Sequence, residues 1–247
     1  MLVNTFTIVL GETLEAGVLG SLLFYSCHRL NITRKVLILG LVFGALGAGL
    51  YGANLSEISN WFDYTGQEWV NALISIGVFL CLTVLAWQLL KNQHGSLLAL
   101  FVCSVMIFVH EGSELYLFYA SIQQANFWQV LLSGLVGLAV GASLGVLIYY
   151  AILLAGPYQI QLAWLLVTLV GAGLLLQASQ YLIQADVLPA MEMLWNSEWI
   201  LSERSSIGQL LTATIRYEST PSLVEVIAYF SAWAVFLGIR YGATARA

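Results

Sequence analysis

Charge is scarce in this sequence of 247 residues. Only 9% of the residues are Asp, Glu, Lys or Arg, and 60% are hydrophobic, whereas a soluble domain usually carries about 25% charged residues. So few charges cannot keep the surface of a water-soluble fold hydrated, which excludes a soluble enzyme and a soluble nucleic-acid-binding protein. The net charge of -5 also argues against a polyanionic partner. The composition predicts an integral membrane protein with several spans.

Cysteine-based sites and nucleotide-binding loops are missing as well. Cys27, Cys81 and Cys103 lie in or beside apolar segments without any Cys-x-x-Cys spacing, so neither a disulfide framework nor a thiolate metal site is predicted. No Gly-x-x-x-x-Gly-Lys-Ser/Thr sequence occurs, so any energy source would be a gradient or a partner protein. The first residues lack a basic region and a small-residue cleavage pattern, so we expect the first span to be retained.

Long apolar runs are what the sequence has in abundance. A helix crosses the bilayer core with about 20 residues, and the runs are far too long for barrel strands. We therefore predict an all-α integral membrane protein, a single transmembrane domain over 1–247 with seven transmembrane helices. The predicted spans are 2–26, 34–53, 69–90, 96–121, 127–155, 161–185 and 222–241, with an outer loop at 186–221 before helix seven.

Basic residues predict the orientation, because they gather in cytoplasmic loops. With the N-terminus outside and the C-terminus inside (N-out/C-in), only Arg204 and Arg216 fall on the outer side. The inner basic residues are Arg29, Arg34, Lys35, Lys91, Arg240 and Arg246.

The acidic residues outside the spans fall in the outer loops. Two interpretations are open: these acids attract cations to the mouth of a pathway, or they are the ordinary composition of outer loops. The residues concerned are Glu57, Asp63, Glu68, Glu192, Glu198 and Glu203.

The two halves of the chain repeat a pattern in opposite directions. The first and fourth spans each contain Glu-x-x-Glu, and the span after each has small residues at four-residue steps, which we interpret as close helix packing. We predict a 3+3 inverted repeat, with repeat one at about 1–90, repeat two at about 96–185, and one additional helix at the edge. Transporters with such repeats hold their substrate near the midplane. The small residues are Gly40, Gly44, Ala48 and Gly52, then Gly137, Gly141 and Gly145.

Four glutamates lie at membrane depth: Glu12, Glu15, Glu111 and Glu114. Inserting an acidic residue at a helix centre costs roughly 2.5–3.5 kcal/mol. Neither span contains a Lys or Arg to neutralise its pair, so a structural salt bridge is a poor explanation. Residues three apart share a helix face, and carboxylate oxygens suit a hard cation. The pattern favours a metal pathway over protonated glutamates buried in the bundle or protons as the transported species.

Other polar residues accompany these carboxylates. His110 borders the face of Glu114, where a role as metal ligand or proton relay and a structural role are equally consistent. Gln177, Gln180 and Gln184 form one stripe of the sixth span, where they either line the pathway or bond between helices.

These residues resemble the oxidase-dependent iron permease family, seven-helix importers whose first and fourth helices each carry Arg-Glu-x-x-Glu. Trp195-Asn196-Ser197 and Pro221-Ser222 resemble the family's outer loop and its approach to helix seven. The resemblance implies high-affinity iron import through the four glutamates, with iron as transported substrate and no permanently bound cofactor. It also implies a plasma membrane protein beside an iron-oxidising or iron-delivering partner, such as a multicopper oxidase or a periplasmic iron-binding protein. Gly11 and His110 stand where the family has arginines.

Three alternatives accompany this interpretation. One is a divergent permease for another metal cation or for protons, and another is a non-transporting membrane subunit of an oxidase or redox complex. The third, a di-iron enzyme, is disfavoured because such sites use Glu-x-x-His, whereas His110 precedes its glutamate. We therefore expect no enzyme, no nucleic acid partner and contact with membrane lipid, in a bacterial inner membrane as the simplest location.

Overall fold

The computed structural model describes residues 2–91, 97–121 and 127–244, and within these ranges it contains helices and no strand. One isolated bridge pairs Met193 with Ser222. The helices are α1 (Leu2–Arg29), α2 (Lys35–Ala53), α3 (Leu55–Ser59), α4 (Gly66–Lys91), α5 (Leu97–Ser121), α6 (Phe127–Leu154), η1 (Gly156–Tyr158), α7 (Gln159–Gln184), α8 (Ser206–Ile215) and α9 (Leu223–Thr244).

Six of these helices are long and apolar enough to cross a membrane, as far as the described residues go: α2, α4, α5, α6, α7 and α9. Each lies within a few residues of a predicted span, and α6 is one unbroken helix. The first predicted span corresponds to α1, which has 28 residues but is not among the six. Ser96, where the fourth span was predicted to begin, and Arg246 lie outside the described residues.

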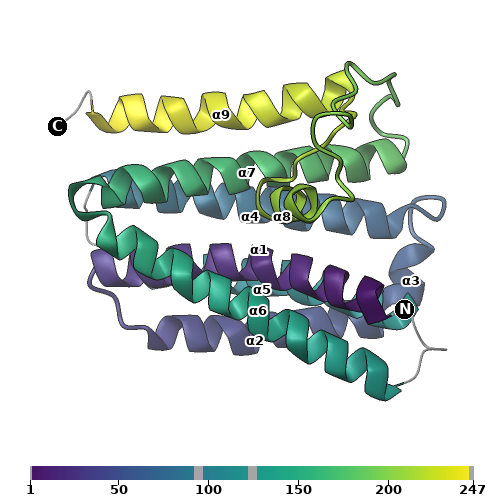
Figure 1. Cartoon of the computed structure of the whole chain (residues 1–247), viewed down its shortest axis with the longest axis horizontal. Helices are drawn as coiled ribbons and strands as arrows, with labels where there is room; N and C mark the ends of the chain where they lie inside the picture. The colour runs from purple at the N-terminus through teal and green to yellow at the C-terminus, as the bar shows by residue number, and fades with distance from the viewer. Residues whose placement is uncertain (1, 92–96, 122–126, 245–247) are drawn as a thin grey trace.

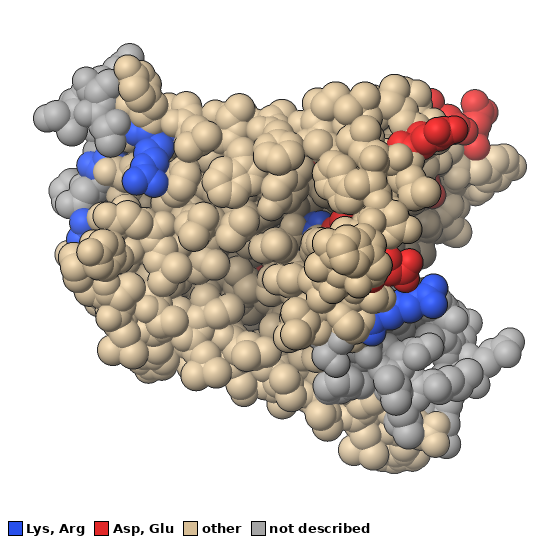
Figure 2. Space-filling model, turned by 45° about the horizontal axis from the view of Figure 1, so that its top comes forward, with Lys and Arg blue, Asp and Glu red and all other residues tan. Residues whose placement is uncertain are grey.

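The long helices run in alternating directions along the longest axis, and the two ends of the chain lie at opposite ends of the molecule (Figure 1). Most of the visible Lys and Arg side chains lie at one end, and Asp and Glu side chains gather mainly at the other, where some basic side chain is also visible beside them (Figure 2). The basic end is where α1 finishes at Arg29 and α4 finishes at Lys91. The fold therefore separates charge along the helix direction, as the loop composition predicts.

Helix packing follows the small-residue pattern of the sequence. The most extensive contacts between helices are those of α1 with α6, α2 with α5 and α4 with α7, while α9 packs on α7 and α4 at one edge (Figure 1). On α2, Gly44 faces Phe108 of α5. On α6, Gly145 lies so close to α1 that a methyl group added to it would be 2.8 Å from Cα of Gly17. This close approach supports interpreting these small residues as packing positions.

Replacing Gly145 with Ala is expected to destabilise the bundle, because the new methyl group meets the backbone of α1 and forces the two helices apart. Overpacking of this kind costs about 1–3 kcal/mol. Thermal unfolding of the protein in detergent measures the effect. The matched control is Gly134→Ala on the same helix, where the nearest atom would be 4.0 Å away and the better helix propensity of Ala is expected to stabilise the helix slightly. Equal unfolding temperatures for the two variants would contradict the packing assignment.

The outer loop predicted at 186–221 folds back onto the bundle. It contains α8, which begins at an N-cap where the Ser205 hydroxyl oxygen accepts a bond from the Gly208 amide at 3.0 Å, satisfying one of the free amides of the first turn. The helix ends at Arg216, whose backbone is left-handed with φ 52°. Because α8 packs against α1 and α7, this loop is positioned to bring a side chain into the bundle.

Candidate functional site

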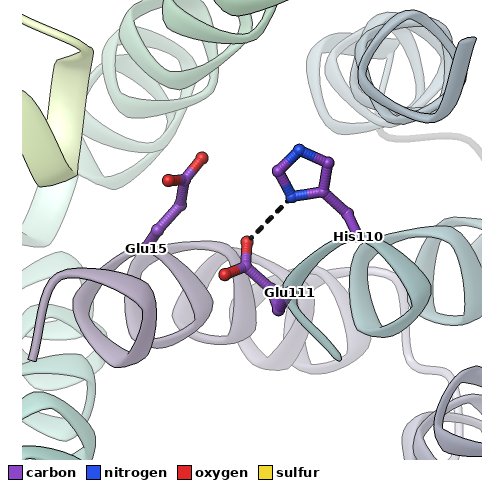
Figure 3. A group of neighbouring side chains, drawn as sticks. All are labelled: Glu15, His110 and Glu111. Atoms are coloured by element: carbon purple, nitrogen blue, oxygen red, sulfur yellow. Dashed lines mark ion pairs between the residues drawn. The ribbon is translucent and has the colours of Figure 1, made fainter. Parts of the chain in front are cut away.

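Three buried side chains from two helices converge on one point. Glu15 of α1 and His110 and Glu111 of α5 are at most 4% exposed, and each offers a ligand atom within 4.8 Å of the others. Figure 3 shows them directed toward the same space, with Nδ1 of His110 lying 3.5 Å from Oε1 of Glu111. Two carboxylates and an imidazole in this arrangement form a candidate metal site.

The imidazole of His110 is also held from α4. The Ser75 hydroxyl lies 2.9 Å from the backbone oxygen of Asn71, to which it can donate, and 3.2 Å from Nε2 of His110. When Nε2 carries the proton of a neutral imidazole and donates it to Ser75, the lone pair is on Nδ1, which faces Glu111. Metal-binding histidines commonly donate their other nitrogen in this way.

The remaining two predicted glutamates lie beside this group. Oε1 of Glu114 accepts hydrogen bonds from Gln177 at 2.6 Å and from Tyr181 at 3.2 Å, and it lies 3.6 Å from Nε2 of His110. The Glu12 carboxyl lies next to that of Glu114. The fold therefore brings all four glutamates together, but Glu114 is held by helix α7 while Glu111 is not.

Several of these polar atoms have no hydrogen-bond partner. Oε2 of Glu12, both carboxylate oxygens of Glu111 and Nδ1 of His110 are buried without a hydrogen bond among the described residues. Burying unpaired polar or charged atoms is costly, so cations or protons must complete the site. Oxygen donors with one imidazole nitrogen suit a divalent or trivalent cation of intermediate hardness such as iron.

The expectation that no salt bridge neutralises the glutamates is wrong. The spans themselves contain no basic residue near the glutamates, but Arg216 enters from the loop after α8. Its Nη2 lies 2.6 Å from Oε2 of Glu15 and 3.7 Å from Oε2 of Glu114. Burial alone would lower the pKa of Arg216, but the carboxylates of Glu15 and Glu114 outweigh that effect and raise it, so the side chain stays charged. A salt bridge therefore accounts for part of the negative charge.

The glutamine stripe of α7 bonds between elements. Gln177 reaches Glu114, as described above, and Gln180 donates to Glu218 at 2.9 Å and to Glu225 at 2.8 Å. Gln184 is exposed at the end of the helix. For the first two residues, bonding between elements describes the geometry better than an open pathway lining.

The outer acids are not gathered at the glutamate group. Most are exposed, while the Glu203 carboxylate accepts a bond from the Ser219 amide at 2.5 Å and Glu68 is partly buried at the start of α4. The exposed ones are Glu57, Asp63, Glu192 and Glu198.

Sequence reasoning missed three residues that shape the site: Arg216, Ser75 and Tyr181. The signal for Arg216 was present, because it is one of two basic residues that break the predicted charge asymmetry. Ser75 and Tyr181 carry no such signal, since serine and tyrosine are ordinary in apolar helices.

One family model, described as the Iron permease FTR1 family, matches residues 82–246, which is more than half of the chain. The match includes Glu111 and Glu114 but begins after α1. Comparison with curated proteins and with solved structures found no match.

Proposed function

We propose that this protein, which belongs to the Iron permease FTR1 family, carries iron across a membrane through the site formed by Glu15, His110 and Glu111. The observation that carries the proposal is the set of buried, unpartnered donor atoms where α1 meets α5. Buried carboxylates of this kind need a cation to balance their charge. Because the chain belongs to a family of iron permeases, we infer that this cation is iron. Iron is the substrate here, held in passing and not as a resident cofactor.

We further propose that α1 is a seventh span and that α1, α2 and α4 form an inverted repeat with α5, α6 and α7. The helix contacts support this. A two-fold axis that exchanges the halves turns the α1–α6 pair into the α5–α2 pair and leaves the α4–α7 pair unchanged. These are the three pairs with the most extensive contacts. The basic end of the molecule (Figure 2) supports an inward orientation for that end. The glutamates then lie near the midplane, where such transporters bind their substrates.

The residues of this site do not fit a di-iron enzyme. Helical di-iron centres draw on Glu-x-x-His from two helices, whereas a single histidine lies in this group and it precedes Glu111. A transporter needs donors that bind a cation without a resident cofactor, and unpartnered carboxylate oxygens meet that need. We propose a bacterial inner membrane location and an iron-oxidising or iron-delivering partner on the side of the acidic residues.

Uptake by purified protein tests the function. We expect liposomes that contain the protein to accumulate radioactive iron, and empty liposomes to accumulate none, when ferrous and ferric iron are supplied separately. Manganese, zinc and a pH gradient are offered in parallel as other cargoes. Accumulation of manganese or protons alone would point to the divergent permease. Accumulation of none of them by correctly folded protein would contradict transport by this chain alone and favour a non-transporting membrane subunit.

A further inference from the structure

Arg216 is paired with Glu15, a residue of the candidate metal site. Its guanidinium lies between carboxylates of α1 and α5, at 2.6 Å from Glu15 and 3.7 Å from Glu114. The side chain is 21% exposed, and its Nε has no hydrogen-bond partner among the described residues. A cation that binds Glu15 must therefore compete with a charge that is attached to the protein.

A cavity of about 260 Å³ adjoins Arg216, and Glu218 also lines it. The walls are mainly apolar, with Leu176 of α7 and Tyr229 of α9 among them. Arg216 thus borders the glutamate group and this cavity at once. Gly173 of α7 leaves room for the stem of the side chain, because a methyl group there would lie 2.9 Å from Cγ of Arg216.

Glu218 offers the guanidinium a second anionic partner. Its carboxylate accepts a hydrogen bond from Gln180, but no Lys or Arg in the described part of the chain forms an ion pair with it. Burial, and then the nearby carboxylates of Glu203 and Glu225, raise the pKa of Glu218. A positive charge placed beside Glu218 would offset the repulsion among these three carboxylates.

We propose that Arg216 is a movable counter-ion with two positions. Without cargo it pairs with Glu15 and Glu114, and when a metal cation enters it turns into the adjoining cavity toward Glu218. Only the side chain moves, because the backbone of Arg216 is fixed in the left-handed cap of α8. The inference rests on the proposed iron site. It adds that the need to displace Arg216 lowers the apparent affinity of that site for the metal.

Equilibrium binding of ferrous iron, and separately of ferric iron, to the full-length protein in detergent tests the proposal. Arg216→Gln removes the competing charge, so we expect about tenfold tighter binding, since apparent affinity scales with the fraction of protein whose site is open. Arg216→Lys keeps the charge and should bind within about threefold of wild type. The matched control is Arg204→Gln, because Arg204 is the other basic residue of the loop and is exposed; its affinity should equal that of wild type.

Glu218→Gln is expected to change the iron affinity in the opposite direction. This variant removes the second position and holds Arg216 in the site, so iron should bind about three- to tenfold more weakly. The double variant Arg216→Gln/Glu218→Gln should bind as tightly as Arg216→Gln alone, because Glu218 matters only through Arg216. A merely structural arginine would not produce this pattern, and the Glu218 arm remains informative if Arg216→Gln does not fold.

The outcomes separate this inference from the function on which it rests. Weaker iron binding by Arg216→Gln, or unchanged binding by Glu218→Gln, in a protein whose wild type binds iron overturns the counter-ion and leaves the iron site standing. Absence of iron binding in wild type, Arg204→Gln and Arg216→Gln alike overturns both.

Discussion

Iron uptake is expected to fall by about 100-fold or more when Glu15 and Glu111 are both replaced with Gln, since even residues that only support a metal ligand commonly contribute 10–100-fold. The amide keeps the size of each side chain but removes the negative charge and half of the acceptor oxygens. Neither oxygen of Glu111 has a hydrogen bond, and Oε1 lies 3.5 Å from Nδ1 of His110, so this buried carboxylate is available to a cation. Radioactive iron entry into liposomes measures the loss.

The control for this double variant removes the same amount of charge elsewhere. Glu192 and Glu198 are exposed in the outer loop, and their replacement with Gln should leave uptake within about twofold of wild type, because exposed charges are screened by salt. Size-exclusion profiles and unfolding temperatures establish that both proteins fold. Uptake above half of the wild-type rate by a folded Glu15→Gln/Glu111→Gln protein would show that the site is misassigned.

Replacing His110 with Leu is expected to weaken iron binding by about tenfold or more, in line with the loss of one ligand from a metal site. Nδ1 of His110 is buried without a hydrogen bond and faces Glu111, so it is the ring nitrogen that a metal at this site would use. Equilibrium dialysis in detergent gives the affinity. The X-ray absorption spectrum of the iron-loaded protein should contain imidazole scattering that the variant lacks.

A variant of the neighbouring residue Ser75 distinguishes a metal-binding His110 from a purely structural one. Ser75→Ala removes the hydroxyl that contacts Nε2 of His110 but keeps the imidazole ring, so its effect on iron affinity should be smaller than that of His110→Leu. Both residues are buried, and unfolding temperatures show whether either change acts through stability. Unaltered iron affinity and an unaltered spectrum in His110→Leu would assign His110 to packing alone.

Local patterns in the sequence predict much of this structure. Hydropathy over about 20 residues located α2, α4, α5, α6, α7 and α9 to within a few residues, because an apolar run in a bilayer has no alternative to forming a helix. Spacing within a helix put Glu111 and Glu114 on one face. The close approach of Gly145 to Gly17 follows from small residues at regular steps.

The tertiary structure alone decided how the charge of the site is balanced. Glu15 and Arg216 are 201 positions apart, and no periodicity links a loop residue to a helix that lies beneath it. The contact depends on α8 packing against α1, which a prediction of spans cannot supply. Likewise the sequence shows His110 as an isolated polar residue, and only the fold places Ser75 of α4 at 3.2 Å from its Nε2 and Glu111 beside its Nδ1. Helices form from local apolar patterns, whereas this site depends on which of their faces and loops meet.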